Sequence, residues 1–309
     1  MSHTEGLLDV AALPGLKIAT YVSTASMAFN MYDYLLTLPT EVKYVWQANW
    51  GVGKVLYLLS RYPLLFAAPL ELRRLTSHVI SEVQCRVLYS LVAYVLALTL
   101  VFSETILIIR VWALWRRQTW VAIVFVCSAA AGAITGLVDI LETTHSVAYL
   151  LNFSQPIVSL SYPICLAIGE NRKLSIVSYV MIMVNAIAVF SLMAIVWIRS
   201  YRGVPFSSMM FTFYKDGLVY FAASLVTAIV NVIVISTQPR EYTNLLFPTQ
   251  AALNSVLSTR MLLNLRQTIR SDLRGVNSVL DSNARHGENG ITGLSLRFAA
   301  ETDGSTIVA

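Results

Sequence analysis

Two ionisable side chains inside apolar stretches are the residues of this 309-residue chain whose types and positions could do chemistry. Arg61 lies seven residues after Lys54, and Glu104 lies six residues before Arg110. At a rise of about 1.5 Å per residue, both lie roughly 10 Å from the same membrane surface if the flanking cations mark that surface. Equal depth predicts an intramembrane ion pair, Arg61–Glu104, which Asp33 could extend. It would be a conformational lock or proton-linked switch, or a purely structural pair that fixes helix packing.

The three cysteines predict one disulfide and one inert thiol. Cys85 opens a predicted span on the outer side, and Cys165 lies in a long outer loop. Both face an oxidising lumen during biogenesis, which favours a Cys85–Cys165 bridge over two free thiols. Cys127 lies in the middle of a predicted span, where a buried, unreactive residue is expected. The same outer loop holds Asn152, the acceptor of a possible N-glycosylation sequon.

No set of residues suits catalysis, a cofactor or a metal. The four histidines are scattered through the chain and form no pair or box for zinc or haem. No Gly-x-Ser-x-Gly element or carboxylate pair indicates hydrolysis. The net charge of +5 comes from Lys and Arg at span ends, which favours membrane anchoring over nucleic-acid binding. We therefore expect a protein that is not an enzyme and has no cofactor.

Long charge-free stretches must position these residues. No Asp, Glu, Lys or Arg occurs between Arg117 and Asp139, or in the windows 174–198 and 217–239. Each window matches the length of about twenty residues that crosses a hydrocarbon core of about 30 Å. The chain is 56% hydrophobic and 13% charged, well below the charge of a soluble domain. The sequence predicts an all-α, multi-pass helix bundle in the plasma membrane or another secretory-pathway membrane.

Seven transmembrane helices are predicted. Their approximate bounds are 10–32, 55–70, 85–109, 120–138, 174–198, 217–237 and 242–263. The stretch 146–168 is also free of charge and is an alternative eighth span, but its two prolines favour a folded outer loop. With seven spans and the N-terminus outside, twelve Lys and Arg lie inside and seven outside, which predicts an N-out, C-in orientation.

The chain divides into a bundle, residues 1–263, and a cytoplasmic tail, residues 264–309. At the start of the tail, leucine and isoleucine side chains fall on one helical face. The other face carries Arg266, Arg270 and Arg274. This pattern predicts a short amphipathic helix whose arginines contact the inner leaflet, with disorder beyond about Val276. The alternative is a plain extension of the last span.

Several motifs resemble a known family. They are the runs Tyr32–Leu38 and Trp50–Tyr57, the segment Ile108–Trp115 and the closing run Ser258–Arg266. These runs resemble a large uncharacterised membrane family that is abundant in mushroom-forming (basidiomycete) fungi and catalogued as a domain of unknown function. The signature is densest over about residues 20–120. The resemblance implies seven helices and carries no activity, ligand or catalytic residue. Trp115-Arg116-Arg117 stands where relatives are expected to have a Tyr-Gly-like turn.

Function then rests on architecture. Seven spans, an outer disulfide and a terminal helix predict a receptor-like sensor that resembles the G-protein-coupled-receptor arrangement. Its partners would be the bilayer, a small-molecule ligand and a cytoplasmic signalling protein. Two alternatives remain open, which are a small-solute transporter or channel and a non-catalytic structural membrane protein.

Overall fold

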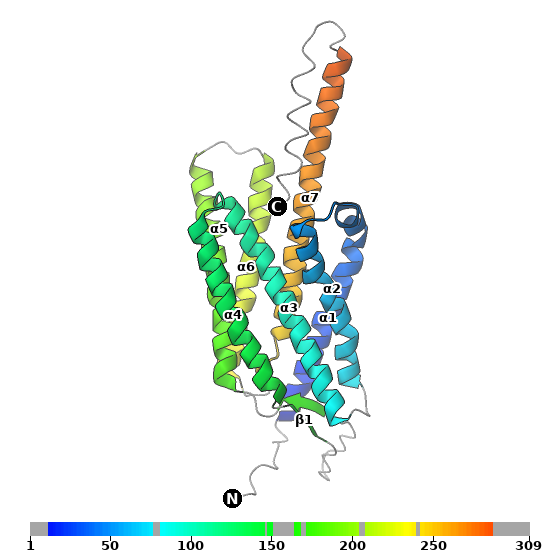
Figure 1. The fold of residues 1–309 in the computed structure, drawn as a ribbon, viewed down its shortest axis with the longest axis vertical. Coiled ribbons are helices and arrows are strands. Elements are labelled where there is room, and N and C mark those ends of the chain that lie inside the picture. The colour runs from blue at the N-terminus through cyan, green and yellow to red at the C-terminus, as the bar shows by residue number, and fades with distance from the viewer. Residues whose placement is uncertain are drawn as a thin grey trace, which may run out of the picture.

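Long helices lying side by side form almost all of the described part of the chain (Figure 1). The computed structural model describes residues 12–76, 81–145, 147–150, 164–167, 171–203, 208–238 and 242–286. The helices in this part are α1 (Ala12–Glu41), α2 (Val52–Thr76), α3 (Glu82–Leu114), α4 (Thr119–His145), α5 (Arg172–Gly203), α6 (Ser208–Thr237) and α7 (Phe247–His286). A short π-helix, η1 (Val42–Trp46), continues α1, and the strands are β1 (Val147–Leu150) and β2 (Ile164–Ala167).

Five of the described helices are long and apolar enough to cross a membrane, and the chain is an integral multi-pass membrane protein. The five segments are Val52–Arg74, Val83–Leu114, Thr119–His145, Arg172–Ile198 and Gly217–Thr237. The remaining helices, α1 and α7, carry too many polar side chains for that criterion. Many of these side chains are buried against neighbouring helices, as Asn254 and Ser255 of α7 are. Such polar helices are stable in a membrane when other helices surround them.

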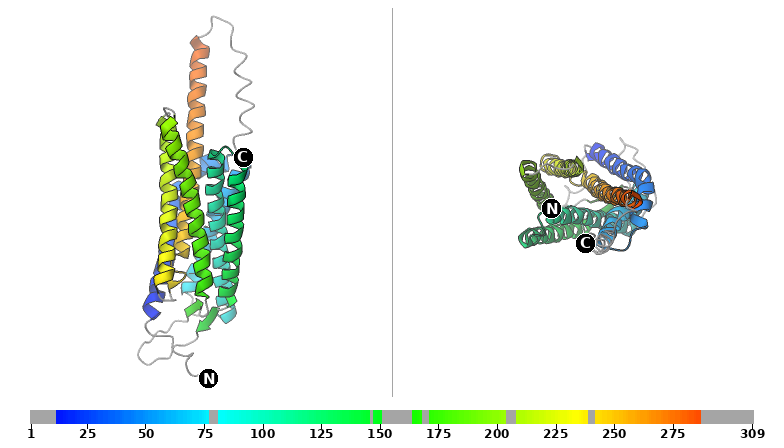
Figure 2. Two further views of the ribbon diagram at one scale, coloured as in Figure 1. Left: turned by 90° about the vertical axis from the view of Figure 1, so that its left-hand side faces the viewer. Right: turned by 90° about the horizontal axis from the view of Figure 1, so that it is seen from above.

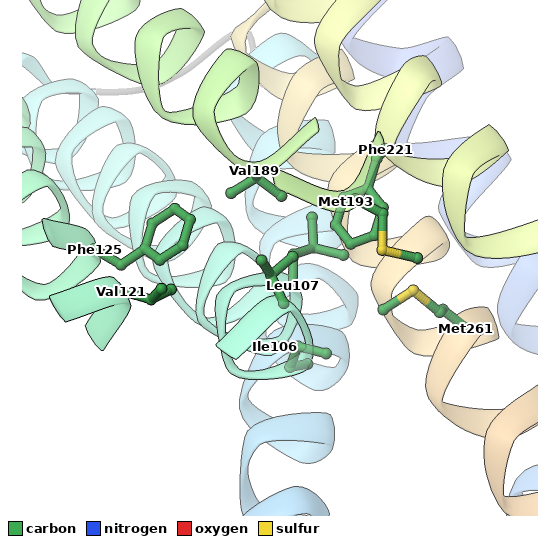
Figure 3. Close-up of a cluster of buried hydrophobic side chains, with 9 residues drawn as sticks. Ile106, Leu107, Val121, Phe125, Val189, Met193, Phe221 and Met261 are labelled. Carbon is green, nitrogen blue, oxygen red and sulfur yellow. The ribbon is translucent and has the colours of Figure 1, made fainter. Parts of the chain in front are cut away.

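Helices α3 and α7 are the centre of the bundle. Helix α3 contacts α2, α4, α5 and α7, and α7 contacts α1, α2, α3 and α6 (Figure 2). One apolar core cluster takes side chains from five helices, including Leu107 of α3, Phe125 of α4, Val189 of α5, Phe221 of α6 and Met261 of α7 (Figure 3). Because this cluster contains side chains of α4, α5 and α7, apolar packing holds α4 and α5 against the rest of the bundle.

The two ends of the bundle differ. At one end β1 pairs with β2 in antiparallel register, with Tyr149 opposite Cys165, and both strands contact α3. Both strands belong to the stretch 146–168, the alternative eighth span, so the described parts of this stretch are strands and not a spanning helix. At the other end α7 leaves the bundle and continues to His286 as one unbroken helix (Figure 1).

The course of α7 corrects the predicted tail. In the described residues α7 runs without a break through residue 263 and past Val276 to His286, as in the alternative of a plain extension of the last span. The apolar residues at 262, 265 and 269 keep the helical period of the preceding span. No proline follows within the helix to end it, so the helix simply continues.

The connection between α3 and α4 is tight. Arg116 and Arg117 have positive φ angles of 51° and 57° and are the two described non-glycine residues in that region. Left-handed backbone costs an L-residue roughly 1–2 kcal/mol. The turn therefore stores strain at the position where the family resemblance led us to expect glycine.

Candidate functional site: a buried charge cluster between α1, α2 and α7

Helix α1 presents three polar side chains on one face. Asp33, Thr37 and Glu41 follow each other at intervals of four residues, which places them on the same side of a helix. Asp33 is 1% exposed and Glu41 is 0% exposed. Two carboxylates are therefore buried on the face of α1 that meets α2.

Arg61 of α2 is the centre of the cluster, and its side chain is 2% exposed. Its Nη1 lies 3.1 Å from Asp33 Oδ2, and its Nε lies 3.4 Å from Glu41 Oε2. Its Nη2 donates to the Asp33 carbonyl at 3.3 Å and to the Thr37 hydroxyl. One guanidinium therefore joins all three polar residues of the α1 face, which suits its fixed fork of donors.

Helix α7 completes the cluster. Arg61 Nη1 donates to Thr259 Oγ1 at 3.0 Å, and Arg260 Nε donates to Asp33 Oδ1 at 2.5 Å. Arg260 is partly exposed, whereas Asp33 is not. The second arginine therefore reaches in from the edge of the cluster.

Aromatic rings close the cluster on its remaining side. Tyr62 OH donates to Glu41 Oε1 at 2.8 Å, and the Tyr62 ring meets Tyr34 and Trp46 edge-on. The Arg61 guanidinium lies over the rings of Tyr34 and Tyr57, 5.5 Å and 5.9 Å from their centroids. These contacts favour a buried cation through the ring quadrupoles.

The charges within the cluster balance. Asp33 and Glu41 carry two negative charges, and Arg61 and Arg260 carry two positive charges. Buried opposite charges compensate each other, whereas the loss of one member leaves an uncompensated charge that typically costs about 3–5 kcal/mol. The cluster therefore fixes the relative positions of α1, α2 and α7.

The predicted Arg61–Glu104 ion pair is wrong. Arg61 pairs with Asp33 and Glu41, and Glu104 accepts a hydrogen bond of 3.0 Å from Asn185 Nδ2 of α5. Equal depth places two residues in one layer of a bundle but does not say which way each faces. Helix α3 turns Glu104 toward α5, away from α2. The predicted involvement of Asp33 is present in the structure, because Asp33 forms the shorter of the two ion pairs of Arg61.

Glu104 lines a small pocket of its own. The pocket lies between α3, α5 and α6, and its polar walls are Glu104, Asn185 and Ser224. Asn185 Oδ1 accepts from Ser128 of α4 at 3.3 Å, and Ser224 donates to Asn254 of α7 at 2.8 Å. Five helices therefore meet in this polar network.

A second ion pair lies toward the other end of α2. Arg74 contacts Glu71 through Nε at 2.8 Å and through Nη2 at 2.6 Å, and Ser23 of α1 donates to Glu71 at 2.8 Å. We did not predict this pair, although Glu71 and Arg74 stand three residues apart, a spacing at which helical side chains meet.

The other predicted site residues have different outcomes. Cys85 is disulfide-bonded and buried, and Cys127 is free. The side chain of Cys165 and all of Asn152 lie outside the described residues, so the Cys85–Cys165 pairing and the glycosylation stay predictions. Cys127 is exposed on α4, not buried as expected, because an all-apolar span gives no sign of which face meets the bundle.

The three tail arginines lie on the extension of α7. Arg266 Nη1 donates to the Tyr44 carbonyl at 3.1 Å, and Arg270 Nη1 donates to the Lys43 carbonyl at 3.0 Å. Arg274 is exposed one turn further along. Lipid contact by these arginines stays a prediction, but the first two are anchored at η1.

The comparison with known families agrees with the position of the cluster. Residues 21–66 match the model of a family described as a family of unknown function (DUF6533). The match covers most of α1, all of η1 and the first half of α2, and it includes Asp33, Glu41 and Arg61. No curated protein matches the chain. The chain is thus a membrane protein in which residues 21–66 are similar to the DUF6533 family, and the buried acids and Arg61 lie within that matched segment.

Proposed function

We propose that this protein is a receptor-like sensor in which α7 transmits a change in the bundle to the cytoplasmic side. The observation that supports this proposal is the double role of α7. Within the bundle, its polar side chains bond to those of α1, α2 and α6. Beyond the bundle, the same helix extends to His286 (Figure 1).

The contacts of α7 form a connected path. Asn231 of α6 donates to Gln250 at 2.9 Å, and one turn later Ser224 of α6 donates to Asn254 at 2.8 Å. Ser255 then donates to the Ser60 carbonyl of α2 at 2.6 Å. Thr259 and Arg260 reach the charge cluster next. Asn254 and Thr259 are about 7.5 Å apart along the axis, so a small rotation of α7 at the pocket changes the geometry at Asp33.

Polar contacts of this kind suit a switch. Hydrogen bonds between helices can exchange partners, and each costs little to rearrange compared with repacking an apolar core. A small molecule that contacts Glu104, Asn185 or Ser224 would bias α7 through Asn254. With the N-terminus outside and the C-terminus inside, the α7 extension lies in the cytoplasm, where a signalling partner would bind it.

A transporter or channel is the second candidate, and Glu104 is the observation that favours it. A carboxylate within a transmembrane helix marks a substrate or ion pathway in many membrane proteins. In the described residues Glu104 has an amide partner, Asn185, and no ion pair with a cation. Such a carboxylate could bind a cation that crosses the bundle.

One set of measurements separates the two candidates. A thermal-shift screen of the purified protein would first find a stabilising small molecule. Saturable binding without flux in proteoliposomes supports the sensor, and binding with flux supports the transporter. A sensor also requires that the compound change the distance between spin labels at Ser278 of α7 and Gln118 of the α3–α4 turn. No change in that distance at saturation would overturn the proposed role of α7.

A further inference from the structure

A group of cations lies where α7 leaves the bundle. Lys43 belongs to η1, and Arg266 and Arg270 stand one turn apart on α7. Both arginines are held by backbone carbonyls of η1, as described above. Lys43 Nζ lies 5.4 Å from the centroid of the Tyr44 ring, and the Arg270 guanidinium lies 5.7 Å from it. Lys43 and Arg270 therefore lie near the Tyr44 ring, and Arg266 contacts the backbone carbonyl of the same residue.

These cations have no anionic partner in the part of the chain that the structure describes. The nearest acid of η1 and α1, Glu41, is bonded to Arg61 and Tyr62. Arg266 is also partly buried, and burial lowers the pKa of its guanidinium from the ordinary value. The space beside Arg266 is narrow, because its Nη2 lies 3.5 Å from the position that a Cβ on Gly53 would occupy. Three cations held close together repel each other, and an anionic ligand would relieve that repulsion.

The surrounding side chains place this group at the membrane surface. Trp46 and Trp50 are exposed, Trp50 by 76%, and both lie in the segment that joins α1 to α2. Lys54 Nζ lies 4.6 Å from the centroid of the Trp50 ring. Exposed tryptophans next to lysines are typical of the level of the lipid headgroups. This level favours a lipid headgroup as the ligand.

We infer that Lys43, Arg266 and Arg270 bind the headgroup of a polyanionic membrane lipid, of the phosphorylated phosphatidylinositol class. Arg266 and Arg270 stand about 6 Å apart along the helix, so they can each take one phosphate of a headgroup that carries two. A lipid with a single negative charge leaves two of the three cations unmatched. The site joins η1 to α7, and this inference does not depend on whether the protein is a receptor.

The test uses the full chain in nanodiscs of three compositions. These are phosphatidylcholine alone, phosphatidylcholine with phosphatidylinositol bisphosphate, and phosphatidylcholine with phosphatidylserine at equal total charge. We expect the bisphosphate lipid to raise the melting temperature and to stay bound in native mass spectrometry, and phosphatidylserine to do neither. Equal effects of the two anionic lipids would overturn the site and leave a diffuse surface charge.

Single substitutions locate the site. Arg266→Ala and Arg270→Ala are each expected to weaken retention of the bisphosphate lipid roughly fivefold, since a basic residue near an anionic surface contributes about 1 kcal/mol. Arg274→Ala is the matched control, because it removes the same charge from an exposed position one turn further along α7. An equal loss for Arg274→Ala would overturn the assignment.

Two further arms cover folding and the source of the phosphate. Melting in phosphatidylcholine alone checks that each variant folds. If Arg266→Ala does not fold, the retention of the bisphosphate lipid by the exposed Arg270→Ala variant decides whether the site exists. Soluble inositol phosphate is then tested on the protein in detergent. Binding of the soluble headgroup as tight as that of the lipid would overturn the lipid assignment.

Discussion

Arg260 Nε lies 2.5 Å from Asp33 Oδ1, and this contact joins α1 to α7, the first and last of the described helices. The two residues are separated by 227 positions. Arg61 approaches the other oxygen of the same carboxylate at 3.1 Å. Asp33 is therefore shared between two cations from two different helices, and it holds α2 and α7 in one arrangement.

A double-mutant cycle tests this arrangement. Asp33→Leu and Arg61→Leu should each lower the stability by about 3 kcal/mol or more, because each leaves buried charge unpaired. The double variant should lose less than the sum of the single changes, measured by thermal melting in detergent. The control cycle pairs Arg61→Leu with Glu104→Leu, and these losses should add. Additive losses for Asp33 and Arg61 would contradict the contact.

The hydrogen bond to Glu104 gives a second prediction. Asn185→Leu removes the amide that donates to this carboxylate, and the lost bond should cost about 1–3 kcal/mol. Asn264→Leu, at an exposed position of α7, is the control and should change the melting temperature little. If both variants have the melting temperature of the wild type, the hydrogen bond between Asn185 and Glu104 does not contribute to stability and the prediction is wrong.

The disulfide is checked chemically. Peptide mapping without reduction should recover the peptide of Cys85 linked to that of Cys165, while Cys127 reacts with an alkylating reagent in unfolded protein. Reduction should lower the stability by about 2–4 kcal/mol, the usual range for a native disulfide. Free alkylation of Cys85 under native oxidising conditions would exclude the bridge.

The strained turn predicts a stabilising substitution. Arg116→Gly removes the cost of a left-handed backbone at an exposed residue, and it should raise the stability by about 1 kcal/mol after the added entropy of glycine is counted. Arg116→Ala is the control, because it removes the side chain but keeps the strain. A gain of equal size for both variants would trace the effect to the charge.

The orientation is tested with a tag. A C-terminal tag should be protected from external protease in intact cells and digested after permeabilisation, since the Lys and Arg distribution predicts a cytoplasmic C-terminus. A glycan on Asn152, detected as a mass shift removed by glycosidase, would place the opposite loop outside. Digestion of the tag in intact cells would overturn the N-out, C-in prediction.

The sequence predicted the helices well where charge alone defines them. The charge-free residues 119–138 and 174–198 lie within α4 and α5, because hydrocarbon excludes charged side chains whatever the packing. The ends of these helices were missed by several residues. Helix α3 begins at a capping box in which Ser81 accepts from Gln84 N and Gln84 accepts from Ser81 N, a signal that the apolar pattern of the span does not contain.

The candidate site was predicted only in part. Arg61 was found because a cation within a span is rare, but its partner was chosen by depth. The spacing of Asp33, Thr37 and Glu41 would have found the acids, since three polar residues at intervals of four mark one helical face. Thr259 and Arg260 left no such signal. Their contact with Arg61 and Asp33 depends on how α7 packs against α1 and α2, which no short stretch of sequence encodes.

The shared carboxylate of Asp33 also has a consequence for synthesis. Asp33, Glu41 and Arg61 leave the ribosome early, whereas Arg260 follows some 200 residues later. Until then the partly made bundle carries one surplus negative charge in the region where the mature protein is neutral. A chain that stops short of α7 keeps this surplus, which makes the membrane-embedded fragment unstable. The charge of Asp33 and Glu41 is thus balanced only when Arg260 of α7 packs against α1 and α2.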